Sequence, residues 1–155
     1  MKIGKMVLVI EDNATYAKII QKRLESRGYR TVVATDGLTG YDQARKIRPD
    51  LILLDLILPG IDGHKVCRLI KFDRNLRNTP IAIFTSRDSE ADESIARKAR
   101  ADAYMLKTVS AGTMLEIIRR LLEKAELYEV EHIRYQGEDV TVLKPRCEPA
   151  ESVAA

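Results

Sequence analysis

Short apolar stretches alternate along the chain with longer amphipathic ones. Five stretches rich in Val, Ile and Leu are predicted to be strands, at residues 5–11, 29–35, 51–55, 81–85 and 103–107. The segments between them are long enough for helices, and this alternation is typical of βαβ units, in which helices cover both faces of a parallel sheet. Right-handed crossovers are then expected. The pattern predicts an α/β fold, a doubly wound five-stranded parallel sheet with five helices that ends near residue 126.

Helical periodicity supports the first and last of these helices. One expected apolar stripe comprises Tyr16, Ile19, Ile20 and Leu24, and another comprises Met114, Ile117, Ile118, Leu121 and Leu122. Their spacing is that of one helix face.

Residues 63–74 and 88–100 are expected to form the third and fourth helices. Gly28 is a stop signal after the first helix, whereas Asp36 and Ser110 are expected to cap the second and fifth helices.

The composition narrows the class of protein. With 155 residues, 45% apolar and 32% charged, the chain fits a soluble globular protein of one main domain. It has neither an 18-residue apolar run nor a signal peptide, so membrane insertion is not expected and the expected compartment is the cytoplasm. The 26 basic and 23 acidic residues nearly balance, which gives little support to direct nucleic-acid binding. Cys67 and Cys147 indicate neither a zinc site nor a disulfide.

Asp55 stands out because it lies in the middle of the apolar run LILLDLILPG. A buried carboxylate is costly unless its charge has a partner. Functional groups in open parallel sheets gather just beyond the carboxyl ends of the strands, and Asp55 would close its strand there. Glu11 and Asp12, Thr85 with Ser86, and Lys107 would lie at the ends of the other strands.

Three carboxylates that converge would repel one another and raise at least one pKa unless a cation lies among them. A hard divalent ion such as Mg²⁺, with oxygen ligands, resolves this. Lys107 would be a second cation, able to pair with Asp55 before reaction and with a phosphoryl oxygen afterwards. With the Thr85 hydroxyl, the set suits phosphoryl transfer to a carboxylate.

The sequence resembles the response regulator receiver domains of two-component signalling, over about residues 5–126. The motifs that carry the resemblance are the pair Glu11-Asp12, Asp55 in LLDLILPGIDG, Thr85 in IFTSRD, and Tyr104 and Lys107 in ADAYMLK. The resemblance implies the flavodoxin-like receiver fold.

The resemblance also implies roles for individual residues. Asp55 would be phosphorylated by a histidine kinase, with Thr85 and Lys107 assisting. Asp12, Asp55 and the backbone carbonyl of Ile57 would bind Mg²⁺, and Glu11 would act through water. No other cofactor is expected. Thr85 and Tyr104 would form the switch: the hydroxyl moves toward the phosphoryl group and the ring turns inward.

This switch would shift a population of conformations, which the surface of the fourth helix, fifth strand and fifth helix reports. The expected partners are a histidine kinase or phosphotransfer protein and a downstream protein target. A homodimer through this surface is a further possibility.

Some positions depart from the family pattern. Thr108 follows Lys107 where the family usually has a cis proline, and a cis bond before threonine would cost roughly 3 to 4 kcal/mol, so a trans bond is expected. Ile57 and Arg87 lie where the family tunes water access. An apolar Ile57 could exclude water, which predicts a slowly decaying phosphorylated state.

His64 and His132 are interpreted as exposed helix residues rather than phosphorelay histidines.

Residues 127–155 form a C-terminal extension. The alternation in HIRYQGEDVTVLK predicts a hairpin within residues 131–144, with Ile133 and Tyr135 facing Val140 and Val142. Such a hairpin should dock on the receiver, a second subunit or a partner, because a lone hairpin is marginal in water. A frayed continuation of the last helix is the alternative. The segment beyond Pro145 is expected to be disordered.

The preferred interpretation is a stand-alone receiver that signals by phosphorylation-dependent protein binding. Apart from its own phosphoryl transfer and slow autodephosphorylation, it would not be an enzyme. One alternative is a pseudo-receiver scaffold without phosphorylation. Another is a magnesium-dependent phosphohydrolase with Asp55 as nucleophile. Such enzymes of the haloacid-dehalogenase type carry another acid two residues on, where this chain has Ile57.

Overall fold

The chain folds around a single sheet. A computed structural model describes residues 4–86, 90–124, 128–135 and 138–145, and the side-chain surroundings of residues 4–86 and 91–123. The strands are β1 (Met6–Ile10), β2 (Arg30–Ala34), β3 (Leu51–Leu54), β4 (Ile81–Thr85), β5 (Ala103–Leu106), β6 (Tyr128–Tyr135) and β7 (Glu138–Pro145). The helices are α1 (Ala14–Glu25), α2 (Gly37–Ile47), α3 (Gly63–Phe72), α4 (Glu90–Lys98) and α5 (Ala111–Lys124). The strand order is β2-β1-β3-β4-β5-β7-β6.

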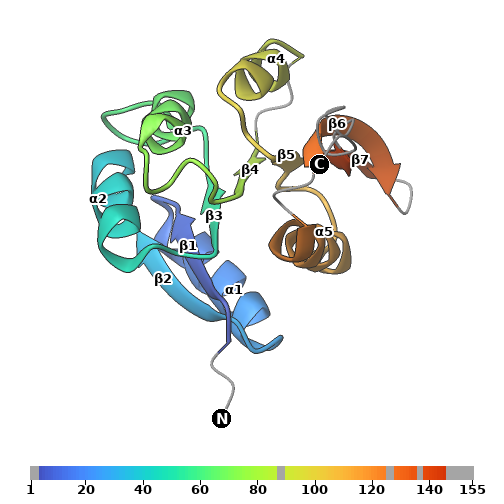
Figure 1. The fold of residues 1–155 in the computed structure, drawn as a ribbon. Coiled ribbons are helices and arrows are strands. Elements are labelled where there is room, and N and C mark those ends of the chain that lie inside the picture. The colour runs from blue at the N-terminus through green and yellow to red at the C-terminus, as the bar shows by residue number, and fades with distance from the viewer. Residues whose placement is uncertain (1–3, 87–89, 125–127, 136–137, 146–155) are drawn as a thin grey trace, which may run out of the picture.

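The first five strands are parallel, which confirms the predicted doubly wound α/β fold. Figure 1 shows α1 and α5 on one face of the sheet and α2, α3 and α4 on the other. Each face has its own apolar core: Ile20 and Ile117 pack in the first, Val66 and Ala96 in the second. β1 and β3 are apolar and buried because helices cover both their faces. The carboxyl ends of all five parallel strands therefore meet at one edge.

Side-chain caps fix where several helices begin. Asp36 accepts a hydrogen bond from the Thr39 amide at 2.8 Å, and Ser110 Oγ accepts one from the Thr113 amide at 3.1 Å, so both predicted caps are confirmed. The α1 stripe was predicted less well. Ile19 is 41% exposed and Ala17 is buried instead, because Ala17, Ile20 and Leu24 share the face that meets the sheet.

The C-terminal extension contains a hairpin that prolongs the sheet. β6 and β7 pair antiparallel, with Ile133 opposite Val140, and β7 pairs antiparallel with β5. The hairpin begins three residues earlier than predicted, at Tyr128, and Tyr135 lies opposite Glu138 rather than a valine. The end of the chain that was expected to be disordered lies outside the described residues. Within the described parts of the chain, no helix is long and apolar enough to cross a membrane.

Candidate phosphoacceptor site

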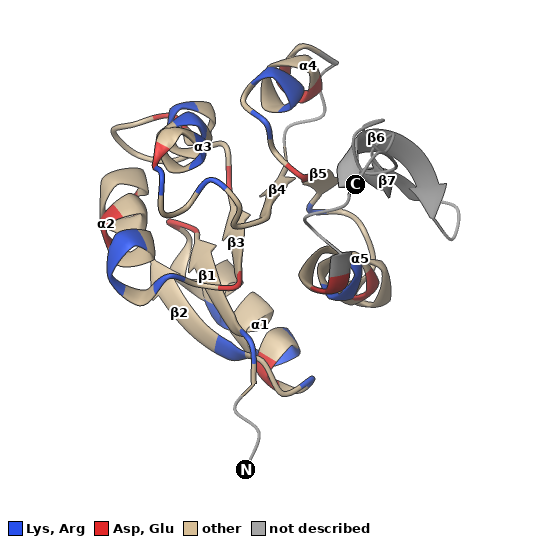
Figure 2. Cartoon of the chain, viewed as in Figure 1, with Lys and Arg blue, Asp and Glu red and all other residues tan. Residues whose placement is uncertain are grey.

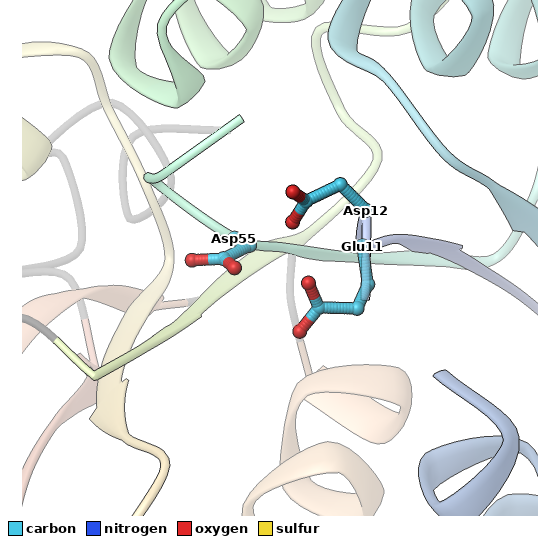
Figure 3. A group of neighbouring side chains, drawn as sticks. All are labelled: Glu11, Asp12 and Asp55. Atoms are coloured by element: carbon cyan, nitrogen blue, oxygen red, sulfur yellow. The ribbon is translucent and has the colours of Figure 1, made fainter. Parts of the chain in front are cut away.

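Three carboxylates meet at the carboxyl edge of the sheet, as predicted. Glu11 and Asp12 follow β1 and Asp55 follows β3, and one oxygen of each lies within 4.8 Å of the others. Figure 3 shows the three side chains beside one another, with the carboxylates of Glu11 and Asp12 directed toward Asp55. Glu11 and Asp55 are only 2% and 6% exposed, whereas Asp12 is exposed. The cluster therefore has a buried base and one side open to solvent.

Backbone contacts hold Asp55 in place. Its amide donates to the Ile10 carbonyl at 3.1 Å, which ties the end of β3 to the end of β1. The Ile57 amide donates to Asp55 Oδ1 at 3.2 Å. The other carboxylate oxygen, Oδ2, lies 3.0 Å from Lys107 Nζ. The two oxygens thus have different partners, and the orientation of the carboxylate is fixed.

Gly63, the first residue of α3, packs directly on the backbone of the acceptor. A Cβ atom at this position would lie 2.4 Å from the Asp55 carbonyl oxygen and 2.6 Å from Leu56 Cα. The Gly63 amide donates to the Leu56 carbonyl at 3.1 Å. Only glycine allows this close approach, so the start of α3 helps to position Asp55. No pattern in the sequence indicated this role for Gly63.

Lys107 is the cation of the site. Its Nζ donates to Glu11 as well as to Asp55, so one lysine joins two carboxylates that come from different strands. The prediction that Lys107 pairs with Asp55 is confirmed, whereas the second partner was not predicted. Nζ also lies 4.4 Å from the centre of the Tyr16 ring, within reach of a cation–π interaction. The Lys107–Thr108 peptide bond is trans, as expected.

The pKa of the Glu11 carboxyl is raised in this arrangement. Burial raises the pKa of the Glu11 carboxyl, and the nearby charge of Asp55 raises it further. Lys107 and the Asn13 amide, which donates to Glu11 Oε2 at 3.2 Å, act in the opposite direction. The pKa of Glu11 is thus raised although the cation Lys107 lies among the carboxylates, and burial rather than repulsion is the larger cause.

Thr85 and Tyr104, the expected switch residues, lie on β4 and β5, the next two strands beyond β3 in the sheet. Thr85 ends β4 and is fully buried, and its carbonyl accepts a hydrogen bond from the Lys107 amide at 2.7 Å. Tyr104 on β5 is 6% exposed and packs in the core between the sheet and α3 and α4. The ring is therefore already turned inward in this conformation.

The donor set fits a hard divalent cation. Glu11, Asp12 and Asp55 offer only oxygen atoms, the chemistry that Mg²⁺ prefers, and the exposed Asp12 leaves room for water ligands. Ile57, whose carbonyl was expected to complete the set, follows on the same loop and has a side chain that is 46% exposed. Arg87, the other position expected to control water access, lies outside the described residues.

The interpretation of His64 as an exposed residue is wrong. His64 is 7% exposed, and its Nε2 lies 3.3 Å from Oδ1 of Asp92, which is 8% exposed on α4. The error has a physical reason: the acid that pairs with His64 comes from another helix, so no local sequence pattern could indicate it. His132 lies on strand β6, not on a helix.

Two further features are the distribution of charge and the cysteines. In Figure 2 both basic and acidic positions occur on α1, α2, α4 and α5, whereas the charged residues within α3 are all basic, namely Lys65, Arg68 and Lys71. Cys67 is buried and reduced, and burial raises the pKa of its thiol to about 12, so it is unreactive. Cys147 lies outside the described residues.

Sequence comparison identifies the family. The model of the response regulator receiver domain matches residues 7–119. The chain belongs to the response regulator receiver family. It is 36% identical over 121 residues to the polar-differentiation response regulator DivK of Brucella anthropi, a match that covers 78% of this chain and 98% of that protein. The DivK protein of Brucella ovis is 35% identical over the same length.

Solved structures agree with this assignment. The receiver domain of the sensor histidine kinase PA1611 from Pseudomonas aeruginosa is 30% identical, with a TM-score of 0.72, and the match covers 77% of this chain and 98% of that one. It was solved with a magnesium ion coordinated in its active-site cleft. A CheY-like receiver from Methanospirillum hungatei has a TM-score of 0.75 at 24% identity, covers 79% of this chain and 97% of its own, and shows the shared fold. The chain is therefore a receiver domain of two-component signalling, a class of domain that interacts with histidine kinases or phosphotransfer proteins.

Proposed function

We propose that this response regulator accepts a phosphoryl group on Asp55 from a histidine kinase or phosphotransfer protein and signals through phosphorylation-dependent protein binding. The observation that carries the proposal is the surroundings of Asp55. Its carboxylate is fixed by the Ile57 amide and by Lys107, and it lies beside Glu11 and Asp12. A nucleophilic carboxylate beside a cation and an acidic, oxygen-rich pocket suits phosphoryl transfer, in which positioning and charge neutralisation dominate.

In the proposed reaction, a carboxylate oxygen of Asp55 attacks the phosphorus of a phosphohistidine. A new P–O bond forms, the P–N bond breaks, and the imidazole leaves with the electron pair. Asp12 and Asp55, with the Ile57 carbonyl, would hold Mg²⁺, and Glu11 would contact it through water. The bound ion supplies positive charge next to the phosphoryl oxygens. Lys107 supplies a second positive charge from the Glu11 side of the site.

After transfer, we propose that Lys107 moves from its carboxylate partners toward a phosphoryl oxygen and that the Thr85 hydroxyl donates to the same group. The Lys107 amide already donates to the Thr85 carbonyl, which holds the two residues side by side at the ends of β5 and β4. Tyr104 lies on β5 and therefore belongs to the output surface, which we define as α4, β5 and α5. This surface would bind a downstream protein or a second copy of the chain.

Ile57 bears on the lifetime of the phosphorylated state. Ile57 lies two residues after Asp55 and is 46% exposed. An apolar group there would exclude the attacking water and slow hydrolysis. A half-life of seconds for phosphorylated Asp55 would contradict this proposal.

The proposal includes no turnover of other substrates, so the chain would not act as an enzyme beyond its own phosphorylation and dephosphorylation. Hydrolysis of small phosphate esters would favour the phosphohydrolase alternative instead. The cytoplasm stays the expected compartment, which cell fractionation would test.

The direct test is incubation with Mg²⁺ and acetyl phosphate, followed by intact mass measurement. The wild-type chain should gain one phosphoryl group, and Asp55→Ala should gain none. Asp42→Asn, a substitution of an exposed acid on α2, is the matched control and should react like the wild type. Size-exclusion chromatography of the same samples would show whether a dimer accompanies the adduct. Absence of the adduct in every sample would favour a pseudo-receiver scaffold.

A further inference from the structure

The β6–β7 hairpin occupies the free edge of β5. β7 pairs antiparallel with β5, with Thr141 opposite Tyr104, and Figure 1 shows the hairpin beside β5 and α5. The family model ends at residue 119, and the match to DivK covers 98% of that relative. The hairpin is therefore an addition to the shared receiver, and it lies on the output surface.

The hairpin is paired far more extensively with itself than with the receiver. Eight residue pairs join β6 to β7, whereas one joins β7 to β5. The register places Glu129 opposite Lys144 and Arg134 opposite Asp139. The pairing of β7 with β5 is thus less extensive than that of β7 with β6, and β6 and β7 can stay paired when β7 leaves β5.

This less extensive pairing is nevertheless enough to keep the edge covered in the isolated chain. α5 ends at Lys124 and β6 begins at Tyr128, so only three residues connect them. A short connection gives an effective concentration in the millimolar range. A separate protein that needs the β5 edge must compete with this tethered occupant.

The position of the pairing connects it to the acceptor. Tyr104, opposite Thr141, lies three residues before Lys107 on the same strand and turn. Lys107 is held by Asp55 and Glu11, and its amide by the Thr85 carbonyl. A movement of Lys107 toward a phosphoryl oxygen therefore acts on the end of the strand that carries the hairpin.

We propose that the hairpin is an intramolecular cover of the β5 edge, which is released when Asp55 is phosphorylated so that a partner protein can bind the output surface. The inference rests on the proposed function, because release depends on the acceptor reaction. Release on phosphorylation would expose the β5 edge only in the phosphorylated state.

Hydrogen–deuterium exchange on the full chain tests this directly, with and without Mg²⁺ and beryllofluoride as the phosphoryl mimic. The mimic should speed exchange of the β5 and β7 amides at least tenfold, while β1 and β3 stay protected. Asp55→Ala should show no change. If the loops around Asp55 and Thr85 respond but β7 does not, the cover inference is wrong and the proposed function stands. If neither region responds, the proposed function fails and the inference with it.

Thermodynamic linkage provides a second test that needs no partner. If the mimic favours release, then release must strengthen binding of the mimic by the same factor. Thr141→Pro breaks β7, since proline is excluded from a strand paired on both sides. We expect it to raise the affinity for beryllofluoride at least threefold, whereas Thr141→Val, which preserves the strand, leaves the affinity unchanged. Equal affinity in both variants, when exchange shows that proline has freed β5, would overturn the inference.

Discussion

His64 on α3 and Asp92 on α4 form a buried contact, with His64 Nε2 3.3 Å from Asp92 Oδ1. The other ring nitrogen, Nδ1, is buried and has no hydrogen-bond partner among the described residues. A buried polar atom without a partner costs stability. The contact therefore joins α3, which packs on the acceptor backbone, to α4 of the output surface. Without a partner for Nδ1 in the described residues, this contact is less stabilising than a fully satisfied one.

Substitution of this pair should show coupling between α3 and α4. His64→Leu removes one partner of the buried Asp92 carboxylate and is expected to lower the free energy of unfolding by about 1 to 3 kcal/mol. The double variant His64→Leu/Asp92→Leu removes both polar groups and should recover at least half of that loss. Urea unfolding of the wild type, the two single variants and the double variant gives the coupling energy. Additive effects would show that the contact contributes nothing specific.

The burial of His64 is a feature that sequence patterns cannot reveal. The succession of strands and helices along the chain and the ends of the strands follow from local periodicity. The general rule for the carboxyl ends of parallel strands then predicted that Glu11, Asp12 and Asp55 lie together. A contact between side chains of different helices has no such signal. The burial of His64 by α4 therefore appeared only in the folded structure.

The lack of a local sequence signal also explains the smaller differences between the predicted and the observed structure. Ile19 is as apolar as Ile20, but the helix turns it about 100° away from the sheet. The pairing of the hairpin with β5 depends on which sheet edge lies within reach after α5, which the hairpin's own sequence does not encode. Tyr16 was predicted as a core residue, and nothing in its sequence context indicated that its ring would lie beside Lys107.

Gly63 should not tolerate a side chain. Gly63→Ala places a Cβ against the Asp55 carbonyl and Leu56 Cα, both backbone atoms that cannot move aside cheaply. We expect a loss of about 2 kcal/mol or more in the free energy of unfolding and a slower reaction of Asp55 with acetyl phosphate. Gly112→Ala in the first turn of α5 is the matched control, since its nearest neighbour would be 4.0 Å away. The control should be neutral or stabilising, and equal losses in the two variants would refute the close-approach argument.

Glu11 should destabilise the metal-free protein at neutral pH. Burial raises the pKa of Glu11 above the ordinary 4.5. Its contribution to the free energy of unfolding is therefore most favourable below that pH and is lost as the pH rises through the folded-state pKa. Glu11→Gln is therefore expected to be more stable than the wild type at pH 7, by about 1 kcal/mol, with a smaller difference at pH 4. Unfolding curves at both pH values measure this.

The exposed N-cap residue Asp36 provides a control, because its pKa is shifted in the opposite direction to that of Glu11. Hydrogen bonds from Thr39 lower the pKa of Asp36, so its contribution is present above its ordinary pKa and is lost on acidification. Asp36→Asn should lose more stability at pH 7 than at pH 3.

Addition of Mg²⁺ should also reverse the benefit of Glu11→Gln, since a bound cation favours the charged form of Glu11. A wild type more stable than Glu11→Gln without Mg²⁺ would show that Lys107 outweighs burial.

Tyr16 should position Lys107 through its ring and not through its hydroxyl. The ring lies 4.4 Å from Lys107 Nζ and stacks on Phe84 with centroids 6.0 Å apart, while its hydroxyl is buried without a partner among the described residues. Tyr16→Phe keeps the ring and removes the unpaired hydroxyl, so we expect equal or greater stability and an unchanged rate of phosphorylation by acetyl phosphate. Tyr16→Leu removes the cation–π contact, and the rate should fall about threefold to tenfold. The fall should be absent in a Lys107→Met background, because the ring then has no cation to position. A rate that depends on the hydroxyl, with Phe as slow as Leu, would instead assign Tyr16 a direct polar role.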